Sequence, residues 1–117
     1  MKEENQVAAV NESTVEVVDQ ENVIILRKPL KDGDTVHDRL YLNLDGLDVN
    51  QIIRADADLS FWMDPQEKAL IVMKQTNFAY HMAIAARACG LTYDVMGRLN
   101  AKDALDISQR VQTFLLT

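Results

Sequence analysis

The sequence predicts an α+β fold in which an N-terminal β-hairpin is followed by a small bundle of three to four α-helices. Three observations support this fold class. Apolar and polar residues alternate over residues 36–44, directly after an Asp-Gly turn. Residues 78–89 form an apolar run that ends at a glycine, and residues 101–116 repeat apolar side chains at three- and four-residue steps. At 117 residues the chain has room for one domain with a core of its own.

Residues 1–21 are expected to form an acidic, flexible N-terminal arm, ahead of a single α+β domain over residues 22–117. Six carboxylates and one lysine give the arm a net charge of −5, against −6 for the whole chain. The arm holds few large apolar groups that would offset the entropy cost of ordering it. If a partner supplies a sheet edge, Val15, Val17 and Val18 can add a strand to it.

The hairpin is predicted over residues 22–44. Its first strand is rich in β-branched residues, and Pro29 either ends it or places it at an edge, because proline has no N–H for a ladder. The Asp32-Gly33 pair favours a tight turn. The alternation buries one face from Leu40 onward, and an isolated hairpin is not stable in water. The leucine face must therefore lie on the helices or on another chain.

The helical part is predicted over residues 48–116, and its first helix ends near residue 59. Asp48 is expected to cap it, with Gln51 at the third helical position in a reciprocal capping arrangement. Asp56 and Asp58 should face water. The inward side should consist of apolar residues: Val49, Ile52, Ile53 and either Ala55 or Ala57.

Residues 60–75 allow two interpretations. Asp64, Pro65 and Glu67 would start a helix, whereas the apolar run at residues 69–73 would suit a buried strand. Periodicity does not separate the two, and we favour an extended segment. A concentrated apolar group precedes it, assigned to the core with a partner-contact patch as the alternative: Phe61, Trp62 and Met63.

A helix over residues 78–89 should begin at Thr76 or Asn77 and end at Gly90, where a left-handed conformation costs glycine nothing. It is so apolar that it must be buried on more than one side. Cys89 is interpreted as a small buried hydrophobic residue, and His81 as a surface or boundary residue.

One or two helical turns are predicted over residues 92–99, capped by Thr92. The last helix should be capped by Asn100, and Asp103 in its first turn is favoured by the helix dipole. Its packing stripe is expected to consist of Ala101, Ala104, Leu105, Ser108, Val111, Phe114 and Leu115.

The residues point away from catalysis, so we expect a protein that is not an enzyme, with no catalytic residue, cofactor or metal site. His37 and His81 have no carboxylate or cysteine at metal-ligand spacing, and four glycines are too few for a phosphate-cradling loop. No basic stripe supports nucleic-acid binding. No apolar run approaches the roughly 20 residues that span a bilayer, and no signal peptide is visible, so we expect a cytoplasmic protein without a membrane partner.

The order of these pieces resembles the tail assembly chaperones of long-tailed bacteriophages and related prophages, from about Val23 to the C-terminus. Residues 60–75 depart most from the pattern. The segments that carry the resemblance are residues 26–30 (Leu-Arg-Lys-Pro-Leu), the Asp-Gly turn, residues 40–44 (Leu-Tyr-Leu-Asn-Leu), 46–53, 83–91, 99–103 and 111–116.

The resemblance implies a small non-enzymatic protein that coats the long, apolar, helical tape measure protein until tail-tube subunits polymerise around it. It also implies a homo-oligomer located in the host bacterial cytoplasm and absent from the mature virion. A structural tail or baseplate-junction protein retained in the particle is the alternative, and a small regulatory or toxin-neutralising module is a third interpretation. The candidate partner contacts are Phe61, Trp62, Met63, Phe78 and Tyr80.

Overall fold

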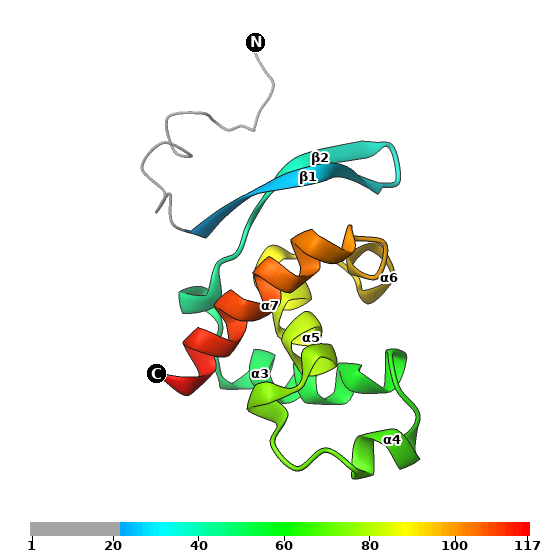
Figure 1. Ribbon diagram of the computed structural model, residues 1–117, viewed down its shortest axis with the longest axis vertical. Coiled ribbons are helices and arrows are strands. Elements are labelled where there is room, and N and C mark those ends of the chain that lie inside the picture. Colours follow the sequence, from blue (N-terminus) through cyan, green and yellow to red (C-terminus); the bar gives the residue numbers. More distant parts are fainter. Residues whose placement is uncertain (1–21) are drawn as a thin grey trace.

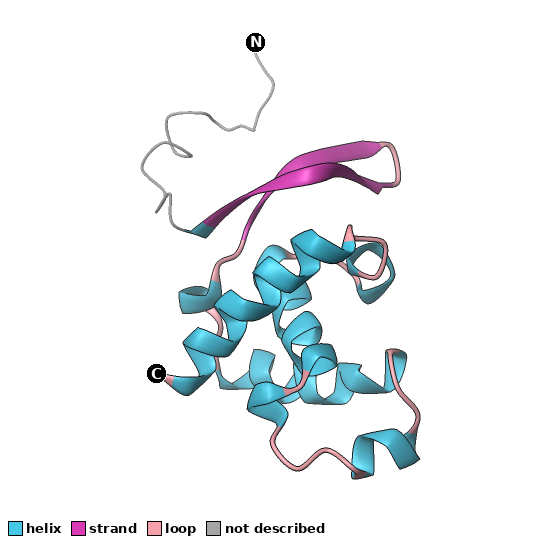
Figure 2. Cartoon of the chain, viewed as in Figure 1, coloured by secondary structure: helices cyan, strands magenta, loops and turns pink. Residues whose placement is uncertain are grey.

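The structure is a computed structural model, and it describes residues 22–117. An antiparallel hairpin of β1 (Val23–Asp32) and β2 (Thr35–Tyr41) lies on one side of a group of helices (Figures 1 and 2). This arrangement confirms the predicted α+β fold with an N-terminal hairpin. The predicted arm, with its three valines, lies outside the described residues.

The helices follow the hairpin in chain order. Short 3-10 turns connect several of them: η2 (Leu44–Gly46), η3 (Leu59–Phe61) and η4 (Lys74–Thr76). The α-helices are α3 (Val49–Asp58), α4 (Pro65–Ala69), α5 (Phe78–Cys89), α6 (Tyr93–Met96) and α7 (Ala101–Leu116). In Figure 1, α7 runs below the hairpin, with α5 behind it and α4 at the opposite end of the molecule.

The hairpin has an irregular register. Val23 pairs with Tyr41 and Ile25 with Arg39, but the pairing then shifts by three positions and resumes at Leu30 and His37. Residues 26–29 form the bulge between the two registers, and the bulge includes the only proline of the hairpin, which therefore removes no ladder bond. The face that turns toward the helices is buried, as predicted for the leucines: Ile24, Leu26, Leu30, Leu40 and Leu42.

A buried carboxylate attaches the bulge to α7. The Asp103 side chain is fully buried and accepts hydrogen bonds from the backbone N–H groups of Arg27, at 2.9 Å, and of Lys28, at 3.4 Å. The Arg27 guanidinium reaches Asp103 at 3.0 Å and Asp106 at 2.7 Å. Asp103 therefore does more than complement the helix dipole, because it satisfies backbone donors that the bulge removes from the ladder.

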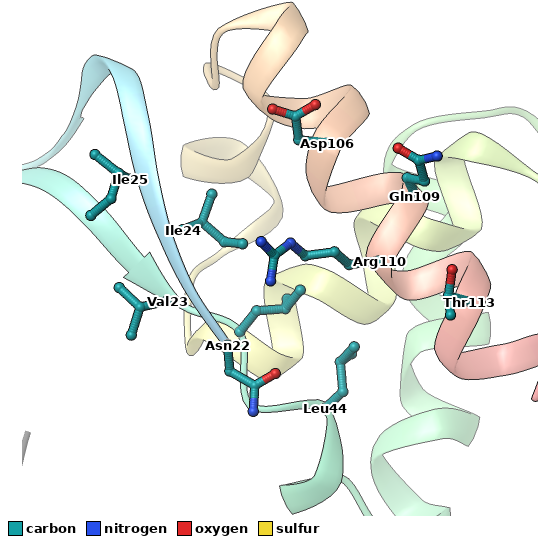
Figure 3. A pocket seen from close by; sticks show the side chains of 10 residues that line it. Asn22, Val23, Ile24, Ile25, Leu44, Asp106, Gln109, Arg110 and Thr113 are labelled. Carbon is teal, nitrogen blue, oxygen red and sulfur yellow. The ribbon is translucent and has the colours of Figure 1, made fainter. Parts of the chain in front are cut away.

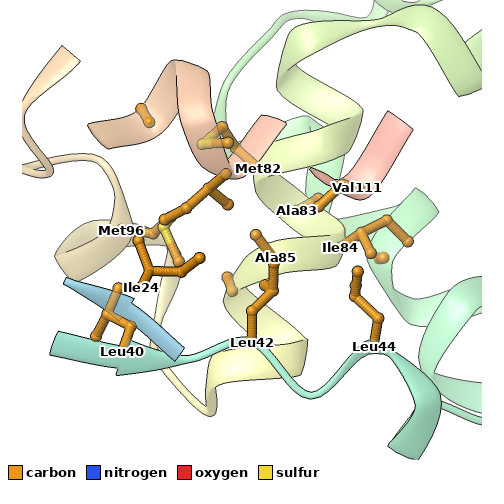
Figure 4. Packing of buried hydrophobic residues seen from close by; sticks show 14 of the residues in the cluster. Ile24, Leu40, Leu42, Leu44, Met82, Ala83, Ile84, Ala85, Met96 and Val111 are labelled. Atoms are coloured by element: carbon orange, nitrogen blue, oxygen red, sulfur yellow. The ribbon is translucent and has the colours of Figure 1, made fainter. Parts of the chain in front are cut away.

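Helix α5 is the centre of the core (Figure 4). Seven consecutive residues, 80–86, are buried, which confirms that this helix is enclosed on more than one side. Both predicted ends are also confirmed: the Asn77 side chain accepts from the N–H of Tyr80, and Gly90 has a φ of 74°. The Leu91 N–H donates to the Ala86 carbonyl at 2.9 Å and closes the helix end.

The packing stripe of α7 is rotated from the one predicted. Its centre is Ile107, which is fully buried and was not part of the predicted stripe, together with Ala104, Ser108 and Val111. Leu105 is 59% exposed, and Ala101 and Phe114 are also exposed, so their predicted places in the stripe are wrong. The hydrogen bonds that Asp103 accepts from Arg27 and Lys28, which we call the Asp103 clamp, fix the rotation of α7. They bring the side of the helix that carries Asp103 and Ile107 inward.

His81 is buried, and the predicted surface or boundary position is wrong. Its Nε2 lies 2.7 Å from the Gln75 carbonyl oxygen, and its Nδ1 lies 2.6 Å from the Ser108 hydroxyl. Because a carbonyl only accepts, Nε2–H donates to Gln75, and the Ser108 hydroxyl, which can donate or accept, satisfies Nδ1. The two bonds connect α5 to α7 and to the segment before α5.

The first helix, α3, packs along a narrower line than predicted. Asp48 caps it at Gln51 N–H as expected, but the cap is not reciprocal, because the Gln51 side chain accepts from Arg87 instead. Ala55 is buried. Val49 and Ile53 lie outside the buried side of the helix and are exposed, contrary to the prediction.

The two aspartates of α3 predicted to face water are only partly exposed. Asp58 accepts two hydrogen bonds from Arg87, at 2.8 and 3.2 Å. Asp56 pairs with Lys74 and, at 3.9 Å, with Lys68. Both carboxylates thus fasten α3 to elements that are far away in the sequence.

The favoured extended segment at residues 69–73 is wrong. Asp64 and Glu67 form a capping box around Pro65 and start the short helix α4. The apolar run that follows is an exposed turn, in which Val72 is 96% exposed and Leu70 79%. Local capping thus determined the structure here, and among the described residues β1 and β2 offer this run no strand partner.

Candidate protein-binding groove

An apolar groove of about 550 Å³ lies between the beginnings of α5 and α7. None of the described residues in its walls is charged, and the Trp62 indole N–H is the only polar side-chain group that they contribute. The lining residues are Trp62, Phe78, Ala79, Met82, Met96, Gly97, Leu99, Ala101, Ala104 and Leu105. We refer to this set as the apolar groove.

Two asparagine caps position the walls of the apolar groove. Asn77 fixes the start of α5 directly before Phe78, and Asn100 accepts from two N–H groups at the start of α7. Phe78 is 46% exposed and Leu105 59%, so each wall presents a large apolar side chain at the rim. Such exposed apolar area gains free energy when a partner covers it.

The floor of the apolar groove is buried and adaptable. Met82 and Met96 lie there with Ala104, and all three are buried. Methionine has three rotatable side-chain bonds and a polarisable sulfur, so it fits partners of different shape. The small lining residues, among them Ala101 and Gly97, let a partner backbone approach closely. The groove therefore suits the apolar face of a helix better than a small polar ligand.

Tyr93 holds Trp62 in place and is itself stacked on Phe61. The Trp62 ring meets Tyr93 edge-on, with centroids 6.3 Å apart, and Phe61 stacks on Tyr93 at 4.1 Å. Trp62 also lines a second cavity of about 430 Å³, with Phe61, Arg87 and Asp58. This second cavity has an ion pair in its wall and is less suited to an apolar partner.

The structure separates the five predicted contact residues. Trp62 and Phe78 lie together in the apolar groove, whereas Phe61 is 54% exposed in the second cavity. Met63 is half-buried against the core and does not line the groove. Tyr80 is 8% exposed and belongs to the core, where burial first and then Asp56 raise its pKa. We therefore leave Tyr80 out of the contact surface.

Sequence reasoning missed most of the groove. Leu105 stands in the predicted packing stripe, and Met82 in the helix predicted to be buried on more than one side, so their apolar character gave no reason to separate a groove from a core. Met96 and Leu99 contribute because the short helix α6 packs against α5, a contact that no local pattern specifies.

A larger cleft of about 690 Å³ lies between β1 and α7 (Figure 3). Asp106, Gln109 and Arg110 of α7 line one side of it, and Figure 3 shows Arg110 extending from α7 toward the hairpin. We refer to this space as the β1 cleft. Its polar wall suits it less to an apolar helix.

Other chemistry is sparse in the described part of the chain. Burial raises the pKa of the Cys89 thiol to about 12, so the thiol stays protonated at neutral pH. Residues 22–117 contain no cluster of three or more His, Cys, Asp or Glu side chains placed to hold a metal ion. None of the helices in that range has both the length and the hydropathy needed to cross a bilayer.

Comparison with known proteins adds no relative: no family model, curated protein or solved structure matches the chain.

Proposed function

We propose that the protein is a non-enzymatic tail assembly chaperone of a long-tailed bacteriophage or prophage. In this proposal the apolar groove binds the apolar helical tape measure protein and keeps it soluble until the tail tube polymerises. The single observation that carries the proposal is the exposed rim formed by Phe78 and Leu105 over a methionine floor. A helix presenting apolar residues every three or four positions would place them along such a groove.

The energetics favour weak binding by each subunit. A groove that covers on the order of 300 Å² of apolar area contributes about 7 kcal/mol at about 25 cal/mol per Å². Association costs of about 4–15 kcal/mol offset most or all of this. Many copies along one tape measure chain would then coat it collectively, and tube subunits could still displace them. Self-association and a location in the host bacterial cytoplasm are parts of the same proposal.

The test is co-expression with the tape measure protein from the same gene cluster, followed by measurement of the soluble tape measure fraction and of its retention by the tagged chaperone. We expect retention by the natural chain and its loss in Leu105→Asp, which places a charge in the rim of the groove. Leu70→Asp is the matched control, because Leu70 is also exposed and lies outside the groove.

Two outcomes would contradict the proposal. If the tape measure protein is not retained at micromolar concentration, the protein is not its chaperone. If retention is lost in Leu70→Asp and kept in Leu105→Asp, the apolar groove is not the binding site. Mass spectrometry of purified particles separates the chaperone from a structural tail or baseplate-junction protein. A chaperone should be absent from the mature virion, and a stoichiometric amount there would indicate the structural role.

A further inference from the structure

The Trp62 indole N–H is a hydrogen-bond donor in a groove that is otherwise apolar. A Cβ placed on Gly97 would lie 3.7 Å from Trp62 Nε1. Gly97 lines the apolar groove and does not line the second cavity, so the nitrogen lies on the groove side of the ring. The edge-on contact with Tyr93 holds the ring in this orientation.

The described part of the chain does not satisfy this donor. Within residues 22–117 the indole N–H forms no hydrogen bond. It is not sealed in the core either, because the only fully buried side-chain nitrogen or oxygen without a partner in that range is His37 Nε2. Solvent can therefore satisfy the N–H while the groove is open. A partner that fills the groove excludes this solvent and loses affinity unless it brings an acceptor.

The surroundings of the donor favour a hydroxyl as the acceptor. None of the described wall residues is charged, so a carboxylate would lose its hydration without a cation to pair with. An amide side chain would bring an NH2 group that the apolar walls do not satisfy. A threonine or serine on a helix avoids both costs. Its O–H can donate to the carbonyl four residues earlier in its own helix while its oxygen accepts from the indole.

The space beside the donor suits such a short side chain. Gly97 has no side chain and Ala101 has only a methyl group, so the backbone of a bound helix can approach the indole closely. The φ of Gly97 is −67°, a value that other residues adopt readily. The absence of a side chain at this position therefore matters for the space that it leaves.

We propose that Trp62 determines specificity in the apolar groove, and that its indole N–H donates to a threonine or serine hydroxyl in the apolar face of the bound helix. This inference rests on the proposed function, in which that helix belongs to the tape measure protein. Apolar contacts are non-directional and let a helix slide along a groove. A single directional hydrogen bond would set the register of each subunit on the helix.

The test compares two synthetic amphipathic helical peptides that differ only at the centre of the apolar face, which is threonine in one and valine in the other. The two side chains have nearly the same shape, and valine gains more from apolar burial. By calorimetric titration we expect the threonine peptide to bind the natural chain about fivefold more tightly. In Trp62→Phe the order should reverse, because the hydroxyl then meets no donor.

A control variant and a spectroscopic signal accompany the affinities. Phe78→Leu changes another large wall residue without removing a donor, so it should keep the preference for threonine. Urea unfolding shows whether both variants remain folded. Trp62 is the only tryptophan of the chain, so its indole N–H gives one NMR signal. That signal should move downfield with the threonine peptide and much less with the valine peptide, because hydrogen bonding deshields the proton.

Two results would overturn this inference and leave the groove as a binding site. One is equal affinity for the two peptides with the same indole shift, and the other is a preference for threonine that survives in Trp62→Phe. If neither peptide binds the natural chain, the inference fails together with the proposed function of the groove.

Discussion

Replacement of Asp103 tests how the hairpin is held on the helices. The carboxylate is buried and accepts from Arg27 N–H at 2.9 Å, from Lys28 N–H at 3.4 Å and from the Arg27 guanidinium at 3.0 Å. A hydrogen bond to a charged group contributes about 1.5–3 kcal/mol, and a donor left unsatisfied costs about 1–3 kcal/mol. Arg27 itself is half-exposed, so water can solvate its charge after the substitution. We expect Asp103→Ala to lower the free energy of unfolding by about 3 kcal/mol.

Two further variants set the scale. Asp103→Asn keeps one oxygen that can accept from the Arg27 N–H but loses the charge, so we expect a loss of about 1–2 kcal/mol. Asp106→Asn removes an exposed ion pair with the same arginine, and its expected cost is about 0–1 kcal/mol. Urea denaturation measures the free energy of unfolding of all three variants, and an unchanged m-value shows that the difference is one of stability. A loss below about 1 kcal/mol in Asp103→Ala, or one no larger than in Asp106→Asn, would refute the clamp.

Three substitutions and one chemical reaction test the remaining structure. Ile107→Ala should lower the free energy of unfolding, measured with heat or urea, by about 2–5 kcal/mol. Leu105→Ala, at an exposed position of the same helix, should lower it by less than about 1 kcal/mol. Equal losses would show that Ile107 is not the centre of the packing stripe of α7. Gly90→Ala should lower the unfolding free energy by about 1–2 kcal/mol, because the φ of 74° strains any residue with a Cβ, and a neutral result would contradict that conformation. The Cys89 thiol, with its pKa raised to about 12 by burial, should react with a disulfide reagent at pH 8 far more slowly in the native protein than in urea; equal rates would show that it is accessible.

Sequence reasoning succeeded where the cause of a structure is local. Asn77 and Gly90 bound α5 as predicted, because a capping side chain and a left-handed glycine act within a few residues. The Asp-Gly turn, whose Gly33 has a φ of 62°, likewise determined the hairpin. The capping box at Asp64 was also visible, but a competing interpretation of the apolar run that follows outweighed it.

It failed where the cause lies across the fold. His81 is polar and was expected near the surface, but Ser108 and the Gln75 carbonyl provide its partners only after α7 packs on α5. Asp103 was noted for its effect on its own helix, and the hairpin bulge that it caps lies 76 residues away. The apolar groove has the same origin. Trp62 and Phe78 can be chosen from the sequence as large apolar residues, whereas the methionine floor forms only where α6 packs against α5 and brings Met96 to the groove that Met82 lines.

The most direct measurement of the central claim uses the methionine methyl groups as reporters. Met82 and Met96 lie in the floor of the apolar groove, and Met63 and Met73 lie outside it. The chain, labelled with ¹³C at the methionine methyls, is titrated with a synthetic amphipathic helical segment of the tape measure protein and followed by NMR. We expect the Met82 and Met96 signals to shift with saturation while those of Met63 and Met73 stay in place. Unchanged floor signals at millimolar peptide, or shifts at Met73 alone, would contradict the claim that this groove binds the tape measure protein.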